Sequence, residues 1–423
     1  MSTAAAPEAG AAAGEPGERR RSRAARLLVL GALTAAAPLS LDTYLPALPA
    51  LAADLRSTPS IAQLSLTTCL IGLALGQLVA GPLSDVLGRR RPMMIGASGF
   101  AVASVLCALA PNVTVLIALR FAQGLLGAVG IVVARAVVRD TSDATRSARA
   151  FATLMLVSGV APIVAPVLGG QLLRFTDWRG VFVVLAVYGA LALVAVLAVV
   201  RETLPRAYRR SGSAAATAGS FRVLLSDRRV VACVLAAGLL FSAMFAYISG
   251  STFVLQDIYG LSPQAFSGVF AVNSVGIVAS VQVAGRLAGA DRVRPERLIA
   301  VGLGVACAGT LGLLGAVLVG AGLAGVLAGL FVTVCGVGLV LPSATTLTLA
   351  DHPEHAGSAS ALLGTSQFLV GAGAAPLVGL AGSGSAVPMA AVMAGAAVLG
   401  TAVFTVVWRS APGAARPPGE PDN

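Results

Sequence analysis

Long apolar runs separated by short polar segments make up most of this chain. A run of about 18 residues or more crosses a hydrocarbon core of roughly 30 Å as a helix. The pattern therefore predicts an all-α membrane protein. Twelve transmembrane helices are expected, at approximately residues 27–50, 60–84, 92–110, 112–136, 150–173, 180–200, 230–254, 264–289, 298–318, 322–349, 357–380 and 385–408.

One long polar segment, residues 201–229, divides these runs into two sets of six. It is rich in arginine and contains the flexible sequence Ser-Gly-Ser-Ala-Ala-Ala. We interpret it as a cytoplasmic linker between two pseudo-symmetric six-helix bundles, residues 27–200 and 230–408, an organisation found in many transporters. Residues 1–26 and 409–423 are expected to be cytoplasmic tails, and their composition predicts disorder.

The formal charge of +11 is distributed unevenly about the expected helices, and all 29 basic residues are arginines. On the twelve-helix interpretation 25 of them lie on one side, whereas Arg56, Arg174 and Arg179 lie on the other and Arg120 lies inside a helix. Cytoplasmic loops carry an excess of basic residues. The amino and carboxyl termini are therefore expected in the cytoplasm, with the chain in a bacterial plasma membrane. The same asymmetry argues against a basic surface for nucleic acid.

Residues 81–92, Gly-Pro-Leu-Ser-Asp-Val-Leu-Gly-Arg-Arg-Arg-Pro, lie between the second and third runs. Gly81 and Pro82 are expected to end a helix, and the rest to form a tight charged hairpin. The segment resembles the loop signature of the major facilitator superfamily, Gly-x-Leu-x-Asp-x-x-Gly-Arg-(Arg/Lys). A weaker copy, with glycine in place of the acid, occurs at residues 285–295. The resemblance implies a conformational gate, in which the arginines reach acids at the end of the fourth helix; a purely topological role is the alternative. The gate residues are Gly81, Asp85, Gly88, Arg89, Arg90 and Asp140.

The fourth run contains an arginine deep in an apolar stretch. Arg120, Gln123, Gly124 and Gly127 fall on one face of a helix. A charged side chain at the centre of a membrane costs at least about 2.5–3.5 kcal/mol, so Arg120 is expected to face protein or a wet cavity. This stripe resembles a second superfamily signature, Arg-x-x-Gln-Gly-x-x-Gly.

Asp42 is the one acid placed well inside the hydrocarbon region. Asp42 lies about eight residues before the outer end of the first helix, and Arg120 lies about eight residues after the outer start of the fourth. At about 1.5 Å per residue, both side chains lie roughly 12 Å below the outer face. Two interpretations stay open for this pair. It forms a static structural ion pair, or Asp42 exchanges a proton while Arg120 tunes its affinity for that proton.

The fifth run carries two prolines and three glycines close together: Gly159, Pro162, Pro166, Gly169 and Gly170. Prolines bend a helix and glycines let helices approach closely, so packing alone explains the pattern. The segment also resembles the Gly-x-x-x-(Gly/Ala)-Pro-x-x-Gly-Gly signature of proton-driven exporters. Its prolines are shifted by one register from their place in the simplest form of that signature.

Further segments resemble drug exporters of the bicyclomycin/chloramphenicol-resistance (Bcr/CflA) type. They are Pro38 to Pro49, Trp178 to Phe182, Tyr247 to Gln256, Phe270 to Asn273 and Ala356 to Gln367. The resemblance implies proton-coupled efflux of small amphipathic drugs by alternating access, with Asp42 and Arg120 in proton coupling. Aromatic and amide side chains suit neutral aromatic solutes, and the binding candidates are Tyr44, Gln123, Tyr247, Gln256 and Asn273.

Other functions remain to be weighed against drug efflux. A dedicated exporter of one endogenous metabolite, or an importer, fits the same fold. An enzyme is not expected, because the chain shows no Ser/His/Asp arrangement, paired carboxylates or nucleotide loop. We expect no cofactor or metal, since the five cysteines lie singly and His352 and His355 fit a polar turn. The protonmotive force supplies the energy, the partners are a drug, protons and the bilayer, and the chain is expected to work as a monomer.

Overall fold

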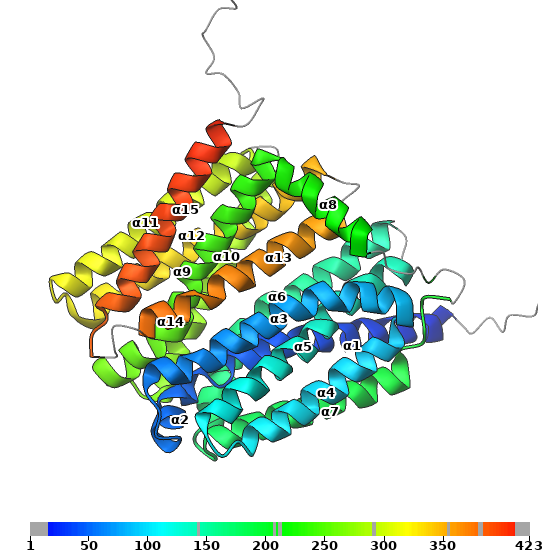
Figure 1. The fold of residues 1–423 in the computed structure, drawn as a ribbon, viewed down its shortest axis with the longest axis horizontal. Helices are drawn as coiled ribbons and strands as arrows, with labels where there is room; N and C mark the ends of the chain where they lie inside the picture. The colour runs from blue at the N-terminus through cyan, green and yellow to red at the C-terminus, as the bar shows by residue number, and fades with distance from the viewer. Residues whose placement is uncertain are drawn as a thin grey trace, which may run out of the picture.

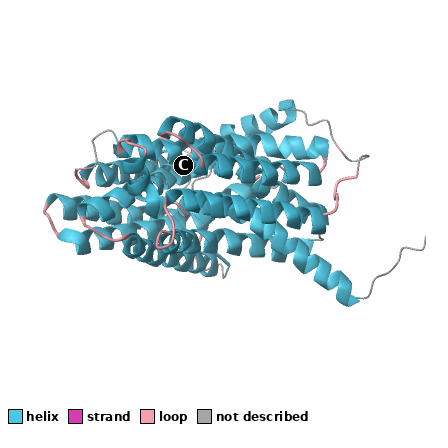
Figure 2. Ribbon diagram, turned by 90° about the horizontal axis from the view of Figure 1, so that it is seen from below, coloured by secondary structure: helices cyan, strands magenta, loops and turns pink. Residues whose placement is uncertain are grey.

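A computed structural model describes residues 16–141, 144–205, 209, 214–289, 293–352, 356–379 and 384–410. All regular elements in these ranges are helices, and they lie side by side with their loops gathered at two ends (Figure 2). Before the linker they are α1 (Pro16–Asp42), the 3-10 helix η1 (Leu45–Ala47), α2 (Leu48–Asp54), α3 (Pro59–Leu87), α4 (Arg90–Ala108), α5 (Val113–Thr141), α6 (Ala144–Leu172) and α7 (Trp178–Val199).

The linker contains one helix, α8 (Ala214–Ser226). The elements that follow are α9 (Arg228–Phe253), the π-helix η3 (Val254–Ile258), α10 (Pro263–Gly289), α11 (Pro295–Leu318), α12 (Gly322–Asp351), α13 (Ala356–Ala372), α14 (Ala374–Gly379) and α15 (Val387–Arg409).

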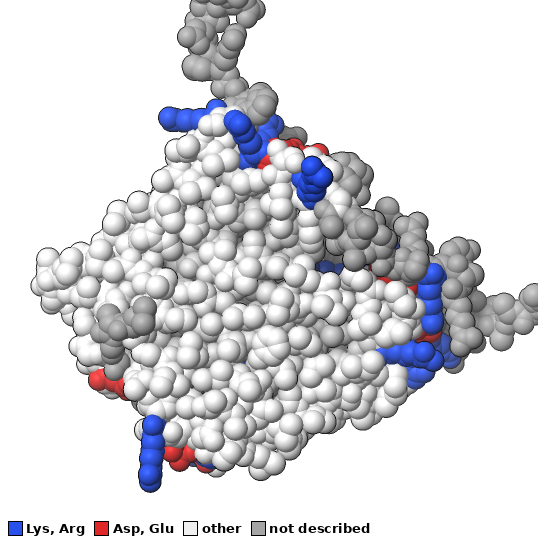
Figure 3. Space-filling view, in the orientation of Figure 1, with Lys and Arg blue, Asp and Glu red and all other residues white. Residues whose placement is uncertain are grey.

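Eleven helical segments of the described chain are long and apolar enough to cross a membrane. The expected fifth span corresponds to α6, whose described apolar stretch, Val160–Leu172, falls in a shorter class. Twelve spans therefore stay a prediction. Charged side chains gather at the edges of the molecule and leave a broad uncharged band between them (Figure 3). This band is the surface that a bilayer would cover.

The helices pack in two groups (Figure 1). We call the elements from α1 to α7, including η1, the first bundle, and those from α9 to α15, including η3, the second bundle. Two seams join them, one between α3 and the pair α13 and α14, the other between α6 and α10. We call the end that carries Arg89 and the linker the arginine-rich end, and the other the opposite end. Helices α4 and α7 lie on the side of the first bundle remote from the second (Figure 1).

Two helix boundaries differ from those expected from the sequence. First, α1 begins at Pro16, inside the segment predicted to be disordered, because nothing after Gly17 interrupts its helix-forming residues. Second, α3 continues through Gly81 and Pro82 and ends at Leu87. A proline removes only one helical hydrogen bond, and here the flanking residues Ala80 and Ser84 are buried against neighbouring helices, which holds the helix together.

Glycines let α3 and α5 approach to backbone contact. A Cβ atom added to Gly72 would meet the carbonyl oxygen of Phe121, and one added to Gly124 would meet the carbonyl oxygen of Cys69. Gly76 likewise lies against the backbone of Leu125. This close seam holds the α5 face that carries Arg120 in a fixed position beside α3.

We expect Gly72→Ala to destabilise the protein by about 1–3 kcal/mol, because the new methyl group overlaps backbone that cannot move independently. The measurement is the melting temperature in detergent. The matched control is Gly304→Ala on α11, where an added Cβ meets nothing within 4 Å. That variant should melt at or above the wild-type temperature, since alanine favours a helix. Equal melting of the two variants would contradict the close seam.

Candidate functional site

A buried polar cluster surrounds Arg120 inside the first bundle. Arg120 is fully buried, and its Nη1 donates a hydrogen bond to Oε1 of Gln123 one turn later on α5. Gln123 in turn donates from Nε2 to Oγ of Ser104 on α4, at 2.7 Å. Nε and Nη2 of Arg120 find no acceptor among the described residues. The guanidinium group therefore keeps hydrogen-bonding capacity in a region with little water.

Aromatic rings hold this cation from one side. The Cζ atom of Arg120 lies 4.5 Å from the ring centroid of Tyr44 and 5.7 Å from that of Phe182. Tyr44 lies between α1 and η1 and is fully buried. Its hydroxyl shares a hydrogen bond of 3.0 Å with Ser65 of α3. Cation–π contact stabilises a desolvated guanidinium by about 2 kcal/mol, so the rings partly replace the missing acceptors.

Asp42 lies at the edge of the same cluster, as the last residue of α1. It is buried and two residues from Tyr44. Asp42 and Arg120 both belong to the described part of the chain, and no ion pair or hydrogen bond joins them. The structure thus shows no direct ion pair between the two side chains, and proton exchange by Asp42 stays a prediction. The two side chains share one buried region without direct contact.

The segment of α6 that carries the glycines and prolines contacts Thr43, which follows Asp42, and also contacts the second bundle. Helix α6 runs without interruption through Pro162 and Pro166. A Cβ added to Gly169 would meet the carbonyl oxygen of Thr43, and one added to Gly170 would meet Ser267 and Pro263 of α10. These two glycines therefore connect the Asp42 region to the second bundle. Gly159 lies in α6, but its surroundings are outside the described part of the chain.

The second bundle contributes a separate polar pair. Asn273 of α10 donates from Nδ2 to the hydroxyl of Tyr247 on α9, at 2.9 Å. The Tyr247 ring stacks on Phe270, with centroids 5.5 Å apart. Both polar residues are buried. The predicted binding residues thus form two groups, Tyr44 with Gln123 and Tyr247 with Asn273.

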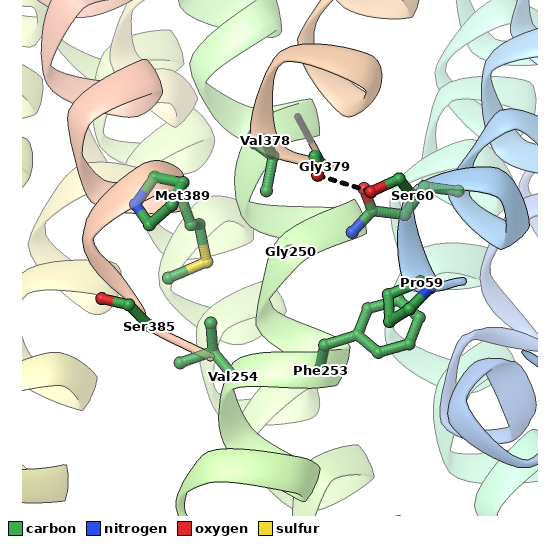
Figure 4. A pocket seen from close by; sticks show the side chains of 11 residues that line it. Pro59, Ser60, Gly250, Phe253, Val254, Val378, Gly379, Ser385 and Met389 are labelled. Atoms are coloured by element: carbon green, nitrogen blue, oxygen red, sulfur yellow. Dashed lines mark hydrogen bonds between the residues drawn. The ribbon is translucent and has the colours of Figure 1, made fainter. Parts of the chain in front are cut away.

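Gln256 belongs to neither group, because it helps to close the opposite end. Four hydrogen bonds join described residues of the two bundles, and all four lie near that end. They run from Ser60 to the Gly379 carbonyl (2.5 Å), from Gln63 to the Ser249 carbonyl (3.2 Å), from Gln256 to the Pro46 carbonyl (3.2 Å) and from Gln264 to the Gly170 carbonyl (2.8 Å). Figure 4 shows the first of them beside a small pocket lined by α3, α9, α14 and α15.

The arginine-rich end holds a second network, centred on Arg89. Its guanidinium pairs with Asp85 at 2.6 Å and with Asp140 of α5 at 2.7 Å, and it also donates to Ser84. Arg90 was expected to reach Asp140 as well, but its Nη2 donates to the carbonyl oxygen of Leu197 on α7. The longer reach of α3 past Gly81 explains the difference, because only Arg89 then faces α5.

Glu202 completes this network from the linker and was not predicted. Its carboxylate accepts from the backbone N–H groups of Arg89 (2.8 Å) and Arg90 (3.3 Å) at the start of α4. Gly88 allows the approach, since its φ is +87° and an added Cβ would meet the Glu202 carboxylate. Partial burial tends to raise the pKa of Glu202, but hydrogen bonds from the N–H groups of Arg89, Leu204 and Arg90 outweigh it and lower that pKa.

We expect Glu202→Ala to lower stability by about 1 kcal/mol near neutral pH, the typical cost of losing a helix cap. The pKa of Glu202 lies below its ordinary value of 4.5, so the stabilisation is present above that value and is lost as the pH falls through the lowered pKa. Melting temperatures measured across this range should therefore converge with those of the wild type in acid.

Glu296→Ala is the matched control for this pH series. Glu296 lies in the first turn of α11, and no hydrogen bond or ion pair joins it to another described residue. Its loss should change the melting temperature little at any pH. A constant difference between Glu202→Ala and wild type, persisting well below pH 4.5, would show that the carboxylate charge is not what holds the linker.

Comparison with solved structures supports the arrangement described above. The crystal structure of a D-xylose–proton symporter superposes with a TM-score of 0.72 at 16% sequence identity, covering 93% of this chain and 98% of that one. At this identity the likeness concerns the fold alone. The shared fold is that of a helical membrane transporter.

Sequence comparison assigns the family. A transporter of Bacillus subtilis (strain 168), the MFS-type YdgK, is 40% identical over 386 residues, which is 91% of this chain and 95% of the relative. The bicyclomycin resistance protein homolog of Haemophilus influenzae is 28% identical over 378 residues, 89% of this chain and 94% of the relative. The family model described as Major Facilitator Superfamily matches residues 30–376. The chain therefore belongs to the major facilitator superfamily of transporters.

Proposed function

We propose that this chain exports small amphipathic solutes, including antibiotics, across the bacterial plasma membrane in exchange for protons. The observation that carries the proposal is the buried Arg120 cluster with Asp42 beside it. Charged groups inside a membrane bundle are costly and mark ion or substrate pathways. The likeness to a bicyclomycin resistance protein homolog supports an antibiotic as the solute.

Asp42 is the proton carrier in this proposal. It is the one acid within the apolar runs that lies away from their ends, and it is not locked in an ion pair. Protonation of Asp42 from outside releases the solute, and loss of the proton toward the cytoplasm restores the solute-binding form. Each charge that moves through the membrane potential gains about 2.3 kcal/mol per 100 mV, which drives export against a gradient.

Alternating access supplies the coupling between the two ends. The four inter-bundle hydrogen bonds close the opposite end, and the distribution of arginine supports a cytoplasmic location for the arginine-rich end. A solute then reaches the site from the cytoplasm in this conformation. For release, all four inter-bundle bonds break. The Arg89 network keeps the ends of α3, α4 and α5 together as the bundles rock.

The solute binds between the two polar groups. Tyr44 and Gln123 face it from the first bundle, and Tyr247 and Asn273 face it from the second. Each pair offers an aromatic ring beside an amide or hydroxyl group, which suits a small aromatic solute with hydrogen-bonding substituents. Rocking of the bundles changes the separation of the pairs, so the same residues bind the solute tightly in only one conformation.

We expect Asp42→Asn to retain solute binding and to lose proton-driven export. Asparagine has nearly the same shape as aspartate but cannot exchange a proton. The measurement is solute uptake into inverted membrane vesicles with an imposed pH gradient, where transport should fall to the level without a gradient. Binding to detergent-purified protein is measured in parallel.

Asp257→Asn is the control. Asp257 lies in η3, is exposed, and makes no hydrogen bond or ion pair with a described residue. This variant should export like the wild type. Normal gradient-driven export by Asp42→Asn would remove Asp42 from the coupling mechanism.

A further inference from the structure

A second arginine, Arg135, lies within the α5 span and is not used by the mechanism above. It precedes the end of α5 at Thr141 by six residues, which places it roughly 9 Å from that end of the helix. Its side chain is exposed. Unlike Arg89, it makes no hydrogen bond or ion pair with any described residue. The described part of the chain therefore offers no partner that explains a charged group in this position.

The position of Arg135 around α5 places it beside α3, which borders the second bundle. Leu126 contacts Gly99 of α4, and Arg135 follows Leu126 by nine residues, which is about 180° around a helix of 3.6 residues per turn. Arg135 therefore lies on the side of α5 away from α4. On the same side of α5, Ala128 lies against Gly76 of α3, and Arg135 follows Ala128 by seven residues, about two helical turns. Arg135 therefore lies beside α3, the helix that contacts α13 and α14 of the second bundle.

Arg120 lies on nearly the same side of α5. Fifteen residues separate the two arginines, which corresponds to about 60° around the helix and roughly 22 Å along it. Arg135 is thus nearer the arginine-rich end and exposed, whereas Arg120 is buried with two nitrogen atoms lacking acceptors. A solute that enters from the arginine-rich end passes Arg135 before it reaches the Arg120 cluster.

No acid of the second bundle offsets these cations. Its apolar runs contain no Asp, Glu, Lys, Arg or His at residues 230–253, 264–285, 298–318, 322–350, 356–379 and 387–408. In the first bundle Arg89 already engages Asp85 and Asp140. The path between the bundles therefore carries two arginines against the single carboxyl group of Asp42.

We infer that Arg135 selects solutes by charge: it excludes lipophilic cations and admits neutral amphipathic solutes that carry strong hydrogen-bond acceptors such as nitro or carbonyl groups. This inference rests on the proposed function. A like charge about 10 Å away at an effective dielectric constant of about 20 lowers the local concentration of a monovalent cation by roughly tenfold. An acceptor group on a neutral solute meets the exposed Arg135 guanidinium first and the region of the Arg120 cluster afterwards.

The test is a charge series at position 135, read as the ratio of cation binding to neutral-solute binding. Chloramphenicol is the neutral probe and tetraphenylphosphonium the cationic one, and both are titrated into detergent-purified protein. The ratio should rise about tenfold in Arg135→Gln and further in Arg135→Glu, and should stay near the wild-type value in Arg135→Lys. The same order is expected for uptake into inverted vesicles.

The matched control is Arg297→Gln, which removes the same charge from an exposed position on α11. It should leave the ratio unchanged. Three outcomes overturn the inference: an unchanged ratio across the series at position 135, an equal rise in Arg297→Gln, or no cation binding by Arg135→Glu. Each of them would fit an arginine that contacts lipid headgroups. Because binding is measured without a proton gradient, these outcomes are independent of whether Asp42 couples transport to protons.

Discussion

The burial of Arg120 is the constraint on which the rest of the site depends. A guanidinium inside a membrane bundle is unfavourable by several kcal/mol unless protein groups surround it. The chain surrounds it with the Gln123 and Ser104 hydrogen bonds and with the rings of Tyr44 and Phe182. The backbone contacts of Gly72 and Gly124 fix α5 in the position that makes this enclosure possible. The side chain is fully enclosed, yet two of its nitrogen atoms have no acceptor among the described residues.

The hydrogen-bond networks at the two ends of the molecule differ in what they join. At the opposite end neutral amides and a hydroxyl donate to backbone carbonyl groups across the bundle interface. Each such bond contributes only about 0.5–1.5 kcal/mol, so a small change in solute or proton binding suffices to shift the balance. At the arginine-rich end the Arg89 network and the Glu202 cap act within the first bundle and its linker. They keep that bundle rigid while the interface changes.

The sequence predicted the helices and the charged residues well, because both leave local signals. Long apolar runs gave the spans, and single polar residues inside them, such as Asp42 and Arg120, stood out against their surroundings. Partners were harder to predict, because they depend on how helices rotate against one another. Ser104, Ser65 and Glu202 are ordinary residues in the sequence and acquire their roles only from packing. The one available signal for Glu202 was a lone acid at the start of the arginine-rich linker. The contact of Gln256 was unpredicted for the same reason, since packing brings it to the carbonyl group of Pro46.

The central claim is that solute and proton compete through Asp42. The most direct measurement is proton release from weakly buffered, detergent-purified protein when chloramphenicol is added, followed with a pH indicator. The account predicts saturable release of no more than one proton per bound solute in the wild type and in Asp257→Asn, and none in Asp42→Asn. Saturable solute binding without proton release, or equal release from Asp42→Asn, would contradict it.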